Sequence, residues 1–296
     1  MKSRTLSSVK LLSAVTAVTM CALTINAYSQ KSTVSKQNTG AVTLEYKFLN
    51  QTPLKYLTTS KMIQIMDFQG QSMQNNINSV FGCSVKAAGK KDRDLVLEIK
   101  ADTLGQTVES PMGTSGGSIS AIKDKVFNVT LSPDGRQTDI SEAAKVVYFT
   151  EGSGESDLSQ TFLEFFPILP LKPVKPGDTW NTVDTIAGKS ASMSTTNVMN
   201  SDDKLEGIEV VDGVECARIS SVLSGTMTIN TQNQGMDIRM HGTYTGTGTL
   251  LFAIKEGYFV KQTSTTKVTG NIEISGAENM TFPVVMDVTS VNEVKK

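Results

Sequence analysis

The chain consists mainly of strand-length stretches in which apolar and polar residues alternate. Residues 42–48 place Val42, Leu44, Tyr46 and Phe48 on one parity, with polar residues between them. Residues 95–99 alternate in the same way, as does the last stretch from residue 280 onward. A period of two is typical of a strand with one face buried. The pattern therefore predicts a mostly β protein.

One alternating run is unusually long. From residue 236 to 254 one parity carries only apolar residues and glycine, and the other carries polar residues as far as Thr249, four of them threonine. A straight strand of this length would extend roughly 60 Å at about 3.3 Å per residue. Since a domain of this size is narrower, the strand must bend or break. Gly242, Gly246 and Gly248 lie on the apolar parity, where larger side chains would resist bending.

The middle of the chain has a different pattern. Residues 105–120 have little periodicity and are predicted as a loop, and residues 126–131 and 137–140 flank a Pro-Asp-Gly turn as a hairpin. Residues 141–148 and 157–166 are the best helix candidates. Prolines 167, 170, 173 and 176 recur every third residue, as in a polyproline II helix. This segment is predicted as a stiff connector.

These elements predict two lobes of curved antiparallel sheet, similar to a barrel or half-barrel, with one or two short helices before the Pro-rich connector. The expected organisation is a signal peptide at 1–29, a flexible N-terminus at 30–40, a β-rich lobe with short helices at 41–166, the connector at 167–177 and an all-β lobe at 178–296.

The N-terminus has the three-part pattern of a secretory signal. Lys2, Arg4 and Lys10 precede a short apolar segment, and small residues precede a cut after Ser29. Lipidation at Cys21 is the alternative, which Met20 directly before it disfavours. The chain after the cut has 25 basic and 29 acidic residues and no apolar segment of the ~20 residues that a spanning helix needs. We expect a periplasmic or outer-membrane-associated protein.

The composition excludes several classes of site. A net charge of −1 argues against a nucleic-acid binder with a basic surface, and one His and three Cys argue against common metal sites. We expect no cofactor. Cys83 and Cys216 remain after the signal; export would allow a disulfide between them, and the alternative is two small apolar core residues.

The apolar parity of the C-terminal strands is rich in methionine, which adapts to irregular apolar partners. This face either lines a concave site for a lipid or other apolar ligand, or packs as an ordinary core. The candidate ligand-binding residues are Met227, Met236, Ile238, Met240, Tyr244, Phe252, Met280, Phe282 and Met286.

Short motifs in the sequence give only weak evidence about function. Residues 113–117 match G-x-S-x-G around Ser115, but no apolar strand precedes them, and His241, the only His, falls on the polar face of a strand. A flexible loop explains the match better than a serine hydrolase does. The triplets 102–104 and 184–186 match a D-T-apolar O-glycosylation signal of some Gram-negative envelopes, with Thr103 and Thr185 as acceptors.

Residues 173–180 carry the signature P-V-x-x-G-D-x-W, and residues 214–219 follow a glycine turn. With the strand at 44–48, these features resemble an uncharacterised family of secreted Gram-negative envelope proteins over roughly residues 42–292. That family has no assigned activity, so the resemblance implies no catalytic residues. The curved sheet is also similar, in architecture only, to periplasmic lipoprotein- and lipid-carrier half-barrels.

The sequence thus favours a non-enzymatic exported protein that binds a lipid or apolar small molecule in a Met-lined concave sheet. The alternative is a structural or protein-interaction module of the envelope without a ligand cavity. A serine hydrolase is the remote alternative.

Overall fold

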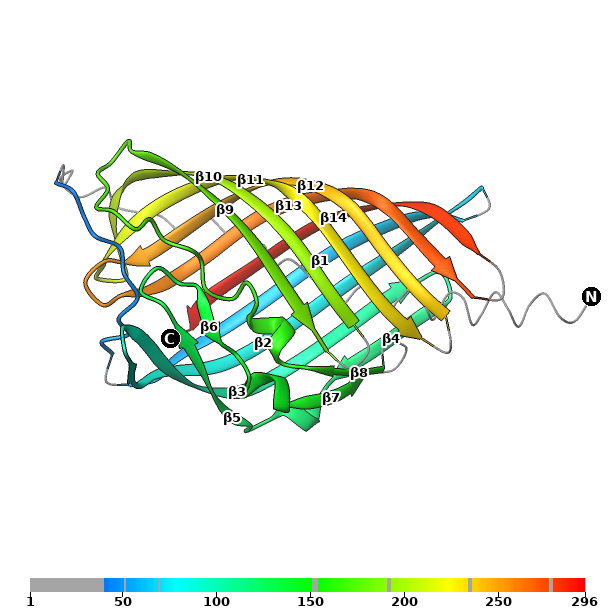
Figure 1. Ribbon diagram of the computed structural model, residues 1–296, viewed down its shortest axis with the longest axis horizontal. Coiled ribbons are helices and arrows are strands. Elements are labelled where there is room, and N and C mark those ends of the chain that lie inside the picture. Colours follow the sequence, from blue (N-terminus) through cyan, green and yellow to red (C-terminus); the bar gives the residue numbers. More distant parts are fainter. Residues whose placement is uncertain are drawn as a thin grey trace, which may run out of the picture.

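The computed structural model describes residues 40–50, 52–68, 70–150, 154–190, 193–233, 236–276 and 279–295. The predicted signal peptide with Cys21 lies outside the described residues, as does the predicted flexible segment up to residue 39. The molecule is a large curved antiparallel sheet with few helices (Figure 1). This confirms the predicted fold class.

The strands in chain order are β1 (Leu54–Phe68), β2 (Gln71–Lys91), β3 (Asp94–Ser110), β4 (Gly113–Ser118), β5 (Val126–Leu131), β6 (Gln137–Asp139), β7 (Val147–Thr150), β8 (Gly154–Asp157), β9 (Thr179–Lys189), β10 (Met193–Val211), β11 (Val214–Asn233), β12 (Met236–Ala253), β13 (Tyr258–Ser275) and β14 (Met280–Lys295). The described helices are the 3₁₀ turns η2 (Ser120–Ile122) and η3 (Ala143–Lys145) and the α-helical turn α2 (Ser159–Phe162).

Twelve strands form one sheet in the order β6-β5-β3-β2-β1-β14-β13-β12-β11-β10-β9, with β4 attached to β3. Strands β7 and β8 form a separate pair. The chain's first long strand, β1, pairs with its last, β14, from Lys55↔Lys295 to Met66↔Val284. The two predicted lobes are therefore parts of one continuous sheet. Strands β6 and β9 end that sheet, so it is an open half-barrel.

The long alternating run forms an unbroken strand. Strand β12 has 18 residues, and a register irregularity against β13 falls near its end, between Leu251 and Phe252. Gly242 and Gly246 let β13 approach closely, since a Cβ on them would lie only 2.7 Å and 2.4 Å from the carbonyl oxygens of Thr269 and Thr265. The strand thus follows the curved sheet without breaking.

Two predictions about strands and loops are corrected. Residues 42–48 have the expected alternation, with Leu44, Tyr46 and Phe48 buried, but they form only an isolated bridge between Val42 and Val174. Residues 105–120 are not a loop: they complete β3 and add β4, in which every residue is exposed. Their weak pattern reflects the glycines of β4, which pair by backbone hydrogen bonds that need no apolar side chain.

The helix predicted at 157–166 is only one turn long, Ser159–Phe162, and Pro167 disfavours helical geometry at residue 166. In the stretch predicted at 141–148, only η3 is helical, and β7 begins at Val147. The predicted hairpin at 126–140 is confirmed by the pairing of β5 with β6. A tight turn at Asp212 and Gly213, both with positive φ, likewise joins β10 to β11.

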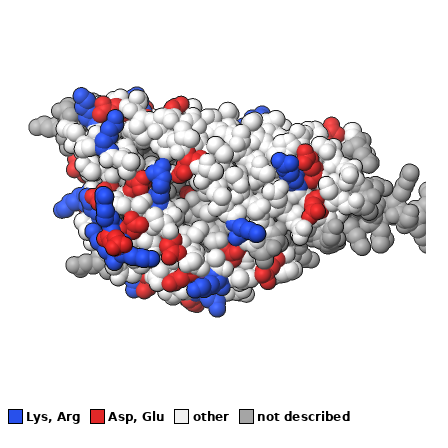
Figure 2. Space-filling view, viewed as in Figure 1, with Lys and Arg blue, Asp and Glu red and all other residues white. Residues whose placement is uncertain are grey.

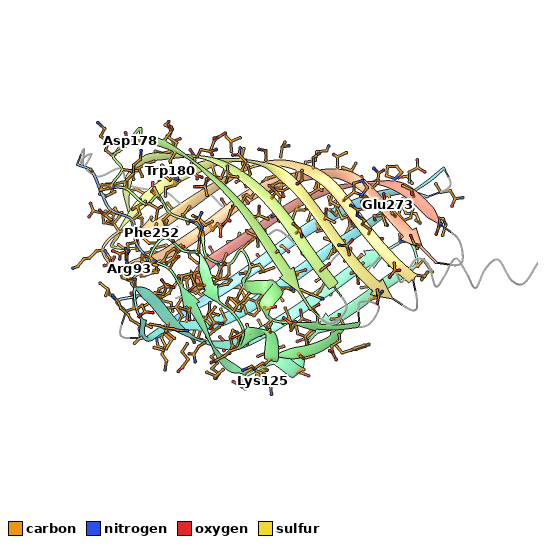
Figure 3. The ribbon with its side chains drawn as sticks, viewed as in Figure 1. Arg93, Lys125, Asp178, Trp180, Phe252 and Glu273 are labelled. Carbon is orange, nitrogen blue, oxygen red and sulfur yellow. The ribbon has the colours of Figure 1, made fainter. Side chains whose placement is uncertain are left out.

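The concave face of the sheet has three zones along the strands. At one end is the aromatic core, a buried cluster around Phe162 and Phe252. At the other is the Met-rich core, a buried cluster around Met240. In Figure 3 Phe252 lies toward the end that carries Asp178, and Glu273 marks the opposite end. The members of the Met-rich core are Met62, Met66, Ile77, Val108, Met193, Met227, Ile229, Ile238, Met240, Tyr244, Val268, Ile272, Ile274, Phe282, Val284, Met286 and Val288.

Between the two cores the same face becomes polar. Ser60 pairs with Ser290, and Ser290 pairs with Ser264, so three serines form a row across β1, β14 and β13. The next row is similar and consists of Thr58, Asn292 and Gln262. We call these six residues the polar belt. It separates the two apolar cores on this face, which also buries the polar residues Gln64 of β1 and Thr266 of β13.

One connecting segment fills the concave face next to this belt. Residues 158–169, here called the plug segment, include α2 and approach both margins of the open sheet. Its Phe162 packs edge-on against Phe127 of β5 at 5.4 Å between ring centroids. On the β9 side, a Cβ on Gly188 would lie 2.4 Å from the Leu163 side chain. The plug segment therefore spans the opening of the half-barrel (Figure 1).

Candidate ligand-binding cavities

Three cavities lie between the plug segment and the concave face, with volumes of about 370, 150 and 100 Å³. The largest shares Leu163, Glu164 and Ile186 with the 150 Å³ cavity. It also shares lining residues with the 100 Å³ cavity, among them Met199 and Leu223. The three spaces thus adjoin one another past the plug segment and could hold one elongated molecule.

The 150 Å³ cavity, here called the inner cavity, has an apolar wall and a polar wall. Its apolar residues include Phe81, Leu104 and Met227. Its polar residues include Thr58 and Asn292 of the belt. Pockets for organic ligands commonly combine an apolar lining with a few polar groups that orient the molecule.

Glu164 contributes the carboxyl group of this site. It lies on the plug segment just before Phe165 and Phe166, which are buried in the aromatic core. Burial raises the pKa of its carboxyl, and a hydrogen bond from the amide of Asn197 partly offsets that rise. No cation contributes to the shift. Glu164 is thus a half-buried carboxyl group that accepts a hydrogen bond from Asn197 and has no positive partner among the described residues.

The largest cavity reaches a charged rim. Arg136, between β5 and β6, pairs with Asp134 and lies 3.6 Å from a carboxylate oxygen of Asp184 on β9. Both Arg136 and Asp184 line this cavity. The ion pair links the two margins of the open sheet. Elsewhere, charged side chains gather at the end of the molecule that carries Asp178 and Arg93, while the middle of the visible face has few (Figures 2 and 3).

The predicted ligand-binding residues are mostly brought together. Six of the nine are buried or nearly buried in the Met-rich core: Met227, Ile238, Met240, Tyr244, Phe282 and Met286. Met236 packs against that core, Phe252 belongs to the aromatic core and Met280 is half-buried. Only Met227 and Tyr244 line one of the three cavities. Ligand binding by this set stays a prediction.

Tyr244 lies close to the polar groups of the plug segment. Burial raises its pKa, and the negative charge of Glu164 adds to that rise. Its hydroxyl is near Asn197 without reaching hydrogen-bond geometry. This tyrosine therefore connects the Met-rich core to the polar wall of the cavities.

Both cysteines in the described part of the chain are free and fully buried, as small apolar core residues would be. Cys83 lies on β2 and Cys216 on β11, with four strands between them in the sheet, so the alternative of a disulfide is wrong for this structure. Burial raises the pKa of both thiols, that of Cys216 to about 12.

The hydrolase motif does not assemble a site. Ser115 is exposed on β4, and His241 lies on the outer face of β12, where its Nδ1 is 3.6 Å from a Glu273 carboxylate oxygen. Strand β4 is attached to β3, and four strands separate β3 from β12 in the sheet. The predicted polar-face position of His241 is thus confirmed, and Ser115 has no His beside it.

The two predicted glycosylation threonines have different settings. Thr185 is exposed on β9, at the margin of the sheet. Thr103 is half-buried on β3 and faces Gly82 of β2, where an added Cβ would lie 2.9 Å from its methyl group. Modification of either residue stays a prediction, and Thr185 is the more accessible acceptor.

The polar residues of the cavities were missed from sequence. Glu164 stands alone in an apolar stretch between Leu163 and Phe165, which is itself a signal. On β14 the buried parity changes from Val288 to Ser290 and Asn292 without a change of face. A polar residue that keeps the parity of a buried face marks an interior polar site, and this signal could have located the belt.

Among the described residues, no helix is long and apolar enough to cross a membrane. No family model and no curated protein matches this sequence. Two solved structures show weak likenesses, both at 10% identity. One is a DUF1329 family protein from Desulfovibrio piger ATCC 29098, with a TM-score of 0.16 over 83% of this chain and 88% of that chain. The other is the COG4313 outer membrane channel from Pseudomonas putida F1, with a TM-score of 0.19 over 87% of this chain and all of that chain.

Proposed function

We propose that this chain is a non-enzymatic protein of the cell envelope that holds a lipid or other apolar ligand inside its half-barrel. The observation that carries the proposal is the series of adjoining cavities between the plug segment and the concave face. The largest, at about 370 Å³, is within the usual size range of ligand pockets, and its apolar lining includes Ile140, Met199 and Leu223.

The arrangement around the cavities supports binding over simple core packing. A plain core would fill the concave face at close-packed density, with few spaces larger than a water molecule. Here the plug segment is densely packed on the aromatic side, where Phe165 contacts Tyr56 at 5.6 Å and Phe259 at 5.9 Å between ring centroids. The space remains beyond these rings, next to the belt.

A matched pair of substitutions on β11 tests the proposal. Leu223 lines two of the cavities, whereas its neighbour Val222 is 60% exposed on the outer face. We expect Leu223→Trp to fill the space and abolish the fluorescence enhancement of N-phenyl-1-naphthylamine, a neutral apolar probe. Val222→Trp adds the same bulk outside and should leave the enhancement unchanged.

The native ligand is tested separately. Protein purified from its own envelope and measured by native mass spectrometry should carry a small-molecule adduct that organic extraction removes. Absence of an adduct, together with no response to the probe by the unmodified protein, would refute the binding proposal. The structure would then be better explained as an interaction module.

Two further proposals concern processing. We propose export through the signal at 1–29 with a cut after Ser29, and O-glycosylation at Thr185 and Thr103. Intact-mass measurement of the exported protein tests both: the mass gives the N-terminus, and Thr185→Val should remove any added glycan mass at that site. An intact Met1 would contradict the export proposal.

A further inference from the structure

The inner cavity has an unusual balance of polar groups. Its lining contains one charged residue, Glu164, and among the described residues that line it there is no Lys, Arg or His. An ionised carboxylate that is partly removed from water costs free energy unless a positive charge pairs with it. The cavity is therefore suited to a molecule that brings a positive charge.

Unsatisfied hydrogen-bond acceptors in the inner cavity also favour a positively charged ligand. Asn197 and Asn292 are each 2% exposed, and the side-chain oxygen of each has no hydrogen-bond partner among the described residues. The Gln160 amide oxygen, which lines the same cavity, also lacks a partner, as does its nitrogen. Buried acceptors without donors each cost about 1–3 kcal/mol. A donor-rich group would satisfy several of them together.

The one cation that lines a cavity together with Glu164, among the described residues, is already ion-paired. Arg136 lines the largest cavity together with Glu164, but its guanidinium pairs with Asp134 and lies 3.6 Å from Asp184. It does not line the inner cavity. Neutralisation of Glu164 by Arg136 would therefore require breaking these ion pairs.

We propose that the inner cavity binds the protonated amine headgroup of an amphiphile, with Glu164 as its counter-charge and Asn197, Asn292 and Gln160 as hydrogen-bond partners. The apolar chain of the ligand runs past Leu163 and Ile186 into the largest cavity. This inference rests on the proposed function and specifies the ligand class within it. An ammonium group carries three N–H donors and no acceptor, which matches an acceptor-rich site.

The raised pKa of Glu164 agrees with this assignment, because an empty site favours the neutral acid and a bound cation favours the carboxylate. The cavity volumes agree as well. About 150 Å³ accommodates a headgroup and a few carbons, and the adjoining space of about 370 Å³ accommodates more of the chain.

The test compares octylamine with octanol, which have equal chains and differ in the headgroup, by isothermal titration calorimetry at pH 7. We expect the protein to bind octylamine at least about tenfold more tightly than octanol. Glu164→Gln should remove that preference and leave octanol binding unchanged. Glu109→Gln, which alters an exposed carboxyl on β3 outside the three cavities, should keep the preference.

Further arms separate the possible outcomes. Glu164→Asp retains the charge and should retain most of the preference for octylamine. If Glu164→Asp keeps the preference and Glu164→Gln loses it, the loss is due to the missing charge and not to misfolding. Ethanolamine has the amine without a chain, and tight binding of it would indicate a small free amine instead of a lipid-like ligand. Equal octylamine affinity in Glu164→Gln and the unmodified protein would overturn the inference. Failure of both amphiphiles to bind would instead count against the proposed function.

Discussion

The two ends of the concave face are both buried, but they are built from different side chains. The buried members of the aromatic core include twelve aromatic residues and no methionine. Those of the Met-rich core include six methionines and only two aromatic residues, Tyr244 and Phe282. The plug segment inserts into the aromatic core, where Phe162, Phe165 and Phe166 contact rings from several strands. No plug residue belongs to the described Met-rich core.

This difference separates a part of the molecule that fixes shape from one that adapts. Aromatic rings packed edge-on at 5–6 Å tolerate little change in volume or orientation. Methionine has three rotatable side-chain bonds and fits many neighbours. The aromatic core therefore holds the plug segment across the opening of the sheet, and the Met-rich core can adjust next to the cavities.

The largest effect is expected where the plug segment enters the aromatic core. Phe162 is fully buried and contacts Phe81, Phe127 and Phe165. Phe162→Ala should lower the free energy of unfolding by about 3–5 kcal/mol, because it removes a large ring and leaves a cavity. Urea denaturation measures the change. A loss below about 1 kcal/mol would show that the plug segment is not fixed by this core.

A smaller effect is expected in the Met-rich core, where side chains of similar volume should replace one another. Met240 is fully buried. Met240→Leu should cost less than about 1.5 kcal/mol. Phe252→Leu is the matched change in the aromatic core, where it also breaks the edge-on contact with Tyr46 at 5.2 Å, and it should cost more. Equal costs in parallel urea titrations would remove the distinction between the two cores.

The fold class followed from the sequence because alternation is a local property. The run at 236–254 predicted both its buried parity and its length, and β12 confirms both. The pairing of β1 with β14 was beyond reach, since the two strands are more than 200 residues apart and no local signal links them. The Pro-rich segment is a clear local boundary and so predicts two lobes, but it does not divide the sheet.

The site was predicted only in part. The Met-bearing face was recognised through its parity, and Met227 and Tyr244 do line cavities. Glu164 was missed because its position depends on the tertiary placement of the plug segment, which the apolar residues around it determine. A single acidic residue in an apolar stretch forms no periodic pattern from which its surroundings could be predicted. Only its burial opposite Asn197 gives it a chemical role.

A substitution that removes a polar group from the polar belt should stabilise the protein, whereas the substitutions in the two cores should destabilise it. Ser290 is fully buried, and its hydroxyl has no partner among the described residues. Ser290→Ala should raise the free energy of unfolding by about 1 kcal/mol, because it removes an unsatisfied polar group. Ser275→Ala at an exposed position should change little. Differential scanning calorimetry gives both values, and a destabilised Ser290→Ala would indicate that its hydroxyl is hydrogen-bonded in solution.

The smallest effect concerns pH and the carboxyl of Glu164. Its pKa in the folded protein is raised above the ordinary 4.5 by burial, so the folded state keeps the proton at a pH where the unfolded state has lost it. Stability from this group is therefore fully present below pH 4.5 and falls as pH rises toward the folded pKa. Arg136, Asp184 and Tyr244 are the other charged or titratable groups that line the same cavity, and none of them is a cause of this shift. Glu164→Gln should remove this fall, so that its melting temperature relative to the unmodified protein is higher at pH 8 than at pH 4. Glu109→Gln should show no such difference between the two pH values.

An identical pH profile for Glu164→Gln and the unmodified protein would mean that Glu164 is well solvated. The polar wall of the inner cavity would then be open to water instead of facing an enclosed ligand site.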